Sequence, residues 1–354
     1  MKREPLVQLP EVLTQAQPRS DARYVMGVDG GATKTLAAVL DLQEQKLHLG
    51  HGGPSNEDAV GAEAAVQALL KAADEAIDHA GIDAGQLGAA VLAIAGTDTE
   101  DVARNVRKAR TDAWLVVNDV VAAWATATGG GPGVAAIAGT GSNVFGVGGV
   151  GADTRAWRVG GWGHLLGDEG SGYWLGVQSI KAALRDRERS GPETALSEAA
   201  LAFFDQPSVE AVAARVYSKP LTKGEIAAFA IETAKLAEQG DAVARELYER
   251  GARELGDQIV AVIRQIGLDA DSDGPQQFPV GLIGSAFKAG RVFVEPLTRA
   301  IHECAPGAQV GAVELAPVGG SLLLAARACG NGEEIEAGEL SRLIDDALPP
   351  SAHP

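Results

Sequence analysis

The chain of 354 residues contains few cysteines and few aromatic side chains. Its two cysteines, Cys304 and Cys329, form no CxxC pair. A thiolate zinc site and a cysteine-ligated iron–sulfur cluster are therefore not indicated. A disulfide scaffold is not indicated either, which fits a reducing cytosol, and we expect a cytoplasmic location.

Basic side chains are also scarce. Lys and Arg number 30 against 47 Asp and Glu, which gives a formal net charge of −17. A surface of this sign repels nucleic-acid phosphates and anionic membranes. We therefore expect neither of them as a partner, whereas a locally positive site for one small anion stays compatible with the composition.

The chain lacks a long apolar run free of glycine. No charged residue occurs between Asp119 and Asp153, but glycines 129–131 and Gly133 interrupt this stretch. Since a membrane-spanning helix would lose backbone hydrogen bonds there, a sheet with glycine turns is the better interpretation. The segment 1–22 is polar, contains three prolines and has no apolar core, so we expect a flexible tail and not a signal peptide.

Glycine is abundant, with 45 residues, and many of the glycines bound short apolar runs. Residues 24–29 predict a strand, a glycine-rich turn follows, and 36–40 resume a strand, as in a hairpin. A helix is predicted from Ser55 to Gly81 by apolar spacing. Further elements follow in alternation: strand 89–95, helix 98–109 and strand 113–117. This pattern predicts an α/β fold with helices on both faces of a sheet.

The second half of the chain repeats this beginning. Strand 134–138, turn 139–143 and strand 144–147 echo the first hairpin and suggest two related halves. Residues 170–267 are predicted to be largely helical, and 278–283 form another apolar strand ending in a glycine. Two more helices are expected at 320–329 and 333–348.

Two glycine-rich turns, Gly30–Thr35 and Gly139–Asn143, are the first candidates for ligand binding. Such turns can direct several backbone amides at phosphate oxygens, and Thr and Ser hydroxyls add donors. A Walker A loop is absent, and the GxGxxG match beginning at Gly146 is not followed by a helical pattern. The alternative is that each turn merely closes a hairpin.

Carboxylates at strand ends are the second set of candidates. Asp29 precedes the first turn and could hold Mg²⁺ through water, and Lys34 could add a positive charge. Asp119 follows the strand at 113–117, where ligands of open α/β sheets gather, and could accept a proton from an attacking hydroxyl. The competing interpretation is that Asp119 caps the helix over 120–126.

The segment 160–171 combines Trp162, His164, Asp168 and Glu169 with five glycines. Neutral sugars are bound by carboxylates that accept paired hydroxyls and by flat apolar surface, and this segment supplies both. The alternative is a structural loop whose two acidic residues cap the next helix, with Trp162 packed and His164 hydrogen-bonded.

These motifs together resemble the N-acetylglucosamine kinases of the BadF-type ATPase/kinase family, in the sugar kinase–actin–heat-shock-protein superfamily. The resemblance runs from about Val25 to Gly330, and its most specific part is 160–171. It implies two ribonuclease-H-like lobes with mixed sheets, flanking helices and a cleft, in the actin-like ATPase fold. Its segments are phosphate loops 29–35 and 139–143, the catalytic Asn118-Asp119, the sugar loop, the adenosine motif 281–285 and the closing motif 317–321.

The resemblance implies ATP-dependent phosphorylation of the 6-hydroxyl of N-acetyl-D-glucosamine, with Asp119 as the base and Mg²⁺ at Asp29. The implied sugar contacts are Asn56, Asp119, Thr140, Gly161, Trp162 and Asp168. The implied nucleotide contacts are Gly31, Thr33, Lys34, Gly139, Gly141, Ser142, Gly284 and Ser285.

By the same resemblance, the lobes are 23–128 with a return at about 318–348, and 129–317 with the ATP site and a helical insertion. A homodimer is compatible with it. In better-known members a Ser-Gly-Gly-Asp stretch helps to hold the sugar, but this chain has Ala95-Gly96-Thr97-Asp98, and Ala95 lacks the hydroxyl. The acceptor is therefore left open between N-acetylglucosamine, glucosamine and N-acetylmuramic acid. The same motifs are also compatible with a BadF-type ATPase and with a non-catalytic, nucleotide-dependent sugar sensor.

Overall fold

The computed structural model describes residues 7, 9–14, 17, 20–31, 33–96, 100–110, 114–149, 151–218, 221–269, 277–332 and 335–348. The chain divides into two compact units. Unit 1 comprises Met1–Ala135, Phe145–Trp157 and Val313–Pro354, and unit 2 comprises Ala136–Val144 and Arg158–Ala312. The lobe ranges given by the resemblance stay a prediction.

The first sheet has five strands in the order β3-β2-β1-β4-β5. They are β1 (Tyr24–Gly30), β2 (Thr35–Asp41), β3 (Lys46–Gly52), β4 (Leu87–Ile94) and β5 (Trp114–Asn118). β1 and β2 form the predicted antiparallel hairpin, and β4 and β5 run parallel to β1. The carboxyl ends of β1, β4 and β5 therefore meet at one edge of this sheet.

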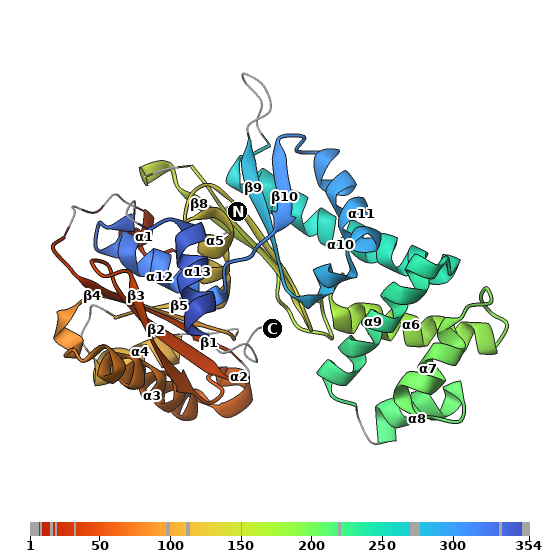
Figure 1. The fold of residues 1–354 in the computed structure, drawn as a ribbon. Coiled ribbons are helices and arrows are strands. Elements are labelled where there is room, and N and C mark those ends of the chain that lie inside the picture. The colour runs from red at the N-terminus through yellow and green to blue at the C-terminus, as the bar shows by residue number, and fades with distance from the viewer. Residues whose placement is uncertain are drawn as a thin grey trace. The chain divides into compact units, whose positions relative to one another are not determined.

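Helices cover both faces of the first sheet, as predicted (Figure 1). One face packs α3 (Ala62–Ala80) and α4 (Glu100–Ala109) through a fully buried cluster that includes Met26, Leu69 and Val102. On the other face, α12 (Pro317–Ala328) approaches β1 so closely that a Cβ on Gly27 would lie 2.6 Å from the Leu322 amide nitrogen. The remaining helices of unit 1 are α1 (Glu11–Thr14), α2 (Glu57–Val60), α5 (Asp119–Thr128) and α13 (Ala337–Ala347), with short 3₁₀ turns at Ala84–Gln86 and Gly151–Asp153.

The helix predicted from Ser55 differs from the structure at its beginning. It is divided into α2 and α3 at Gly61, whose φ of 82° a helix does not tolerate. Its end agrees with the prediction, since Gly81 caps α3 with a φ of 68°. Within the expected N-terminal tail, Leu13 of α1 is fully buried and the Ser20 amide donates to the Cys329 carbonyl.

The second sheet repeats the order of the first. Its strands are β6 (Gly133–Ala138), β7 (Ser142–Gly148), β8 (Arg155–Gly160), β9 (Phe278–Ile283) and β10 (Ala308–Ala312). The order is β10-β9-β6-β7-β8, so β6 takes the central place of β1, and β7 and β9 take those of β2 and β4. This common topology confirms that the chain contains two related α/β sheets.

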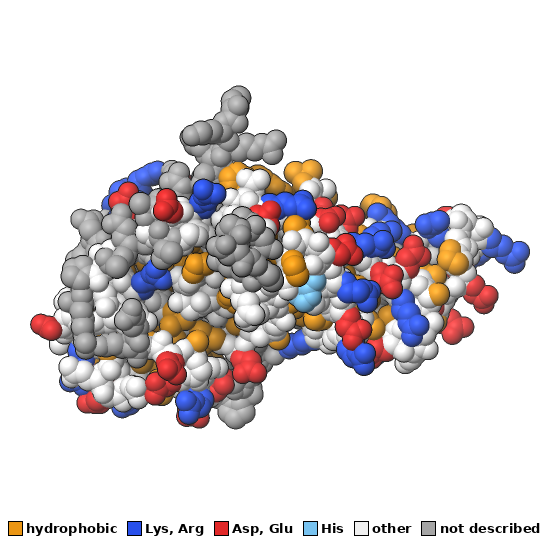
Figure 2. All heavy atoms as spheres, turned by 90° about the horizontal axis from the view of Figure 1, so that it is seen from above, with side chains coloured by type: hydrophobic (Ala, Val, Ile, Leu, Met, Phe, Trp, Pro, Cys, Tyr) orange, Lys and Arg blue, Asp and Glu red, His pale blue; other side chains and the backbone are white. Residues whose placement is uncertain are grey.

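The segment between β8 and β9 is helical, as predicted. It contains α6 (Gly172–Arg187), α7 (Leu196–Phe204), α8 (Val209–Ser218), α9 (Lys223–Gln239) and α10 (Ala242–Ile266), while Ser285–Ala289 and α11 (Arg291–His302) follow β9. Helices α7, α8 and α9 pack against α6 (Figure 1). Figure 2 shows basic and acidic side chains interleaved over the helices of unit 2, where Arg291 pairs with Glu295 and Lys235 with Glu232. Within the described ranges, no helix is both long and apolar enough to cross a membrane.

Candidate functional site

Two of the predicted carboxylates lie at one edge of the first sheet. The register aligns Gly30 of β1 with Ile94 of β4, and Ile94 with Asn118 of β5. Asp29 directly precedes Gly30, and Asp119 directly follows Asn118. Because neighbouring strands are about 4.8 Å apart, these carboxylates belong to strands about 10 Å apart whose ends point the same way.

Asn118, and not Asp119, is the N-cap of α5. Its backbone is extended, with φ −67° and ψ 147°, and its side-chain oxygen accepts from the Val120 amide at 3.2 Å. The Asn118 amide group also donates to the Gly96 carbonyl at 2.9 Å, which ties the cap to the end of β4. The competing interpretation of Asp119 as the cap is therefore wrong. Asp119 is the half-buried first residue of the helix, near the positive end of the helix dipole.

The first glycine-rich turn is closed on itself and joined to the next candidate. The Gly31 amide donates to the Lys34 carbonyl at 3.0 Å, and Thr33 and Lys34 are exposed. The Ser55 amide donates to the Gly31 carbonyl at 3.0 Å, which places Asn56 directly beside this turn. The Asn56 side-chain oxygen is buried and has no hydrogen-bond partner among the described residues. It is therefore an acceptor that a ligand hydroxyl or amide could satisfy.

Asp29 has a carboxyl group with a raised pKa. Burial raises the pKa of its carboxyl to about 6, and the positive charge of Lys34 only partly opposes this rise. Within the described part of the chain, no hydrogen-bond donor reaches this carboxylate. A half-buried carboxylate with this environment fits a cation or a water of its shell as a partner.

The predicted phosphate and adenosine residues of unit 2 come together at strand ends. Gly139, Thr140 and Gly141 form the turn between β6 and β7, and Ser142 begins β7. Gly284 follows β9, the neighbour of β6, and a Cβ there would lie 2.4 Å from the Ala138 carbonyl oxygen. Its φ of 119° and this close approach require glycine. Ser285 is exposed beside Gly139.

The predicted sugar segment follows β8 and is held close to the turn at 139–141. Gly160 and Gly161 both have positive φ, and a Cβ on Gly161 would lie 2.7 Å from the Asn143 side-chain nitrogen. Trp162 is 54% exposed, with the Arg158 guanidinium 5.6 Å from its ring centroid. A flat, solvent-exposed aromatic ring is the kind of surface on which a sugar ring packs. His164 instead packs edge-on against Tyr173 at 5.1 Å between ring centroids.

Asp168 is buried at the end of this segment, with 8% of its surface exposed and a φ of 62°. One carboxylate oxygen accepts from the Ser142 amide at 3.1 Å. Burial raises the pKa of its carboxyl, and the Ser142 amide and the charge of Lys223 oppose this rise. The carboxylate can therefore accept further hydrogen bonds, which paired sugar hydroxyls could donate.

Two features of this site were not predicted from the sequence. The Asn143 side-chain oxygen is buried without a partner among the described residues, and its place in the Gly139–Asn143 turn was a local signal for it. Gln258 of α10 donates to the Glu169 carboxylate at 2.9 Å, and nothing in the sequence near 169 indicated this contact. Of the segment Ala95-Gly96-Thr97-Asp98, the last two residues lie outside the described part of the chain.

Comparisons with known proteins identify the family of the chain and relatives that are sugar kinases by name. The model of the BadF/BadG/BcrA/BcrD ATPase family matches residues 26–325. A protein of Clostridium acetobutylicum named N-acetylmuramic acid/N-acetylglucosamine kinase is 33% identical over 251 residues, covering 70% of this chain and 81% of that protein. An N-acetyl-D-glucosamine kinase of Dictyostelium discoideum is 28% identical over 319 residues, covering 85% and 97%. The crystal structure of a candidate N-acetylglucosamine kinase from Chromobacterium violaceum gives a TM-score of 0.65 at 25% identity, covering 86% and 100%.

Proposed function

The chain belongs to the BadF/BadG/BcrA/BcrD ATPase family, and from this premise we propose that it is an ATP-dependent kinase of amino sugars. The reaction transfers the terminal phosphoryl group of ATP to the 6-hydroxyl of N-acetyl-D-glucosamine and gives the 6-phosphate and ADP. The observation that carries the proposal is the repeated sheet, in which β1 and β6 occupy the same place and each ends in a glycine-rich turn. The names of the relatives select an amino sugar as the acceptor.

Asp119 is the proposed general base. Asp119 follows β5 at the carboxyl edge of the first sheet, and Asn118 serves as the N-cap of α5. A carboxylate there can orient the sugar hydroxyl and accept its proton as the phosphoryl group moves. Asn56, Thr140, Gly161, Trp162 and Asp168 are the proposed sugar contacts.

The phosphates are proposed to bind at the two turns. Thr140 and Gly141 have amides with no hydrogen-bond partner among the described residues, which suits phosphate oxygens. The other proposed nucleotide contacts are Gly31, Thr33, Lys34, Gly139, Ser142, Gly284 and Ser285. Asp29 is the residue that would hold Mg²⁺, since no donor among the described residues reaches its carboxylate. A bound Mg²⁺ would neutralise charge on the transferring phosphoryl group.

The proposal is tested by measuring ADP release with ATP and a panel of N-acetylglucosamine, N-acetylmuramic acid, glucosamine or no sugar, with the phosphorylated carbon identified by NMR. We expect release to require a sugar, to be fastest with N-acetylglucosamine, and to place phosphate on O6. Sugar-independent release would instead identify an ATPase, and sugar binding without release would identify a sensor. N-acetylmuramic acid is in the panel because the name of the Clostridium relative includes it.

A homodimer in the cytoplasm, acting on these small molecules without nucleic acid, completes the proposal. Light scattering coupled to size-exclusion chromatography measures the oligomeric state, and a homodimer gives twice the mass of the chain.

A further inference from the structure

Two loops of unit 2 that the proposed function assigns to different ligands are joined by hydrogen bonds. One is the phosphate turn 139–143, and the other is the stretch 161–173, which contains the sugar segment and the start of α6. Ser142 makes two of the bonds as donor: its amide donates to Asp168 (3.1 Å) and its hydroxyl donates to the Glu169 carbonyl (2.8 Å). Three backbone amides donate in the other direction. They are Gly161 to the Ser142 carbonyl (3.1 Å), Gly172 to the Gly139 carbonyl (2.8 Å) and Tyr173 to the Thr140 carbonyl (3.3 Å).

Asp168 supplies the one charged group in this set. Asp168 and Ser142 are both buried residues, with 8% and 4% of their surfaces exposed. A hydrogen bond from an amide to a carboxylate is stronger than one between neutral groups, and more so away from water. A Cβ on Gly141 would lie 3.0 Å from the same carboxylate, so glycine is what allows the turn to approach it.

The donors of the turn 139–143 fall into two groups, those that bond within the protein and those without a partner among the described residues. The amide and the hydroxyl of Ser142 both donate inside the protein, which leaves Ser142 no donor for the nucleotide contact proposed above. The amides of Thr140 and Gly141 have no partner among the described residues. The second carboxylate oxygen of Asp168 also receives no hydrogen bond within that part of the chain. One oxygen of Asp168 therefore contacts the turn, and the other has no partner among the described residues.

The Asp168 backbone supports a specialised role. Its φ of 62° is left-handed, a conformation that costs a non-glycine residue free energy unless its surroundings fix it. Glycine and asparagine adopt this conformation more readily than most residues, so substitutions by either leave the backbone intact.

We propose that Asp168 is a positioning residue for the nucleotide as well as a contact for the sugar. One oxygen fixes the turn 139–143 so that the Thr140 and Gly141 amides face the phosphates, and the other accepts a sugar hydroxyl. The inference rests on the proposed function. Because one carboxylate serves both ligands, sugar binding tightens nucleotide binding, and nucleotide tightens sugar binding by the same factor.

The test is the affinity for the ATP analogue AMP-PNP, measured by calorimetry in the absence of sugar, for wild type, Asp168→Gly and Asp168→Asn. Asn keeps an oxygen that accepts from the Ser142 amide, so its Kd should stay within about threefold of wild type. Gly removes the acceptor, and its Kd should rise about tenfold. A residue that only contacted sugar would leave both values unchanged, and that result would overturn the proposal, as would equal losses in both variants.

A second measurement does not depend on the variants folding. Amide hydrogen exchange of the wild type, followed by NMR, should show Ser142 protected and Thr140 and Gly141 exchanging much faster. Equal rates at the three amides would overturn the positioning role. Failure of the proposed function gives a different result, because none of the sugars would then support ADP release while the pattern of AMP-PNP affinities persisted.

Discussion

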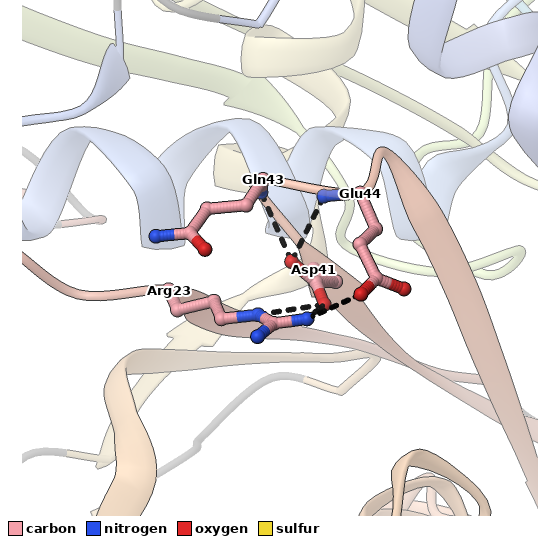
Figure 3. Close-up of polar contacts among 4 residues, drawn as sticks. All are labelled: Arg23, Asp41, Gln43 and Glu44. Atoms are coloured by element: carbon pink, nitrogen blue, oxygen red, sulfur yellow. Dashed lines mark hydrogen bonds and ion pairs between the residues drawn. The ribbon is translucent and has the colours of Figure 1, made fainter.

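The two ends of the β1–β2 hairpin each carry an aspartate, and the pKa values of the two carboxyl groups are shifted in opposite directions. At one end, Asp41 accepts from the Arg23 side-chain Nε at 2.9 Å and from the amides of Gln43 and Glu44 at 3.0 and 3.1 Å (Figure 3). Burial alone would raise the pKa of this carboxyl, but these donors outweigh it and hold the pKa below its usual range. At the other end, Asp29 lacks such donors in the described part of the chain, and its pKa rises to about 6.

This difference separates a carboxylate with a structural role, Asp41, from the one proposed to bind the metal, Asp29. Asp41 closes the turn 41–44 and is complete without a ligand. Asp29 has a raised pKa and receives no hydrogen bond within the described part of the chain, a combination common among groups that serve a reaction. Strand position alone does not distinguish the two residues, whereas their hydrogen-bond donors do.

The largest expected difference between Asp29 and Asp41 is in the effect of their substitution on activity. Asp29→Asn should lower kcat for ADP release by about 100-fold or more, since removal of one electrostatic stabiliser costs that much. Asp41→Asn is the matched control at the other end of the hairpin, and its kcat should stay within about twofold of wild type. Comparable losses in both variants would remove the functional distinction.

The next effect concerns stability. Asp41→Ala leaves the amides of Gln43 and Glu44 without their acceptor, and the free energy of unfolding should fall by about 2 kcal/mol. Urea unfolding at pH 7 measures this. Glu44→Ala is the control, because Glu44 is 65% exposed and its pairing with Arg23 should contribute less than about 0.5 kcal/mol. Equal losses would show that the exposed pair carries the turn.

The smallest effect is a pH dependence of opposite sign at the two ends. Asp41 has a folded pKa below its unfolded value of about 3.9, so its stabilisation is complete above about pH 4 and is lost as pH falls through the folded pKa. Asp29 has a folded pKa of about 6, so its ionisation costs stability increasingly from about pH 4 to pH 6.

Asp29→Asn should therefore stabilise the ligand-free protein at pH 7 by about 1–2 kcal/mol, and the gain should vanish near pH 4. Thermal unfolding without Mg²⁺ across pH 4–8 provides the measurement. A gain that is the same at every pH would exclude the carboxyl group of Asp29 as its source.

The sequence predicts most strands well because glycines mark their ends. The predicted strand 278–283 coincides with β9, and Gly81 ends α3 as expected. The two-sheet fold and the family resemblance are both confirmed. These features depend on short apolar runs and on backbone conformations that few residues tolerate, so they are visible locally.

Other features depend on contacts that local sequence does not contain. Asn118 and Asp119 are adjacent and both residue types favour N-caps, so only the register at the end of β5 decides which one caps α5. The Ser142–Asp168 hydrogen bond joins positions 26 residues apart, and the Gln258–Glu169 bond joins positions 89 apart. The predicted roles of individual site residues accordingly stay predictions until they are tested.

The most direct test of the kinase proposal is the Asp119→Asn variant, because Asn118 still caps α5 and asparagine has nearly the same shape as aspartate but cannot act as a carboxylate base. We expect kcat for phosphorylation of N-acetylglucosamine to fall by about 10²–10⁴-fold, with the sugar Kd from calorimetry changed by less than about threefold. Turnover close to that of wild type would contradict the assignment of Asp119 as the base.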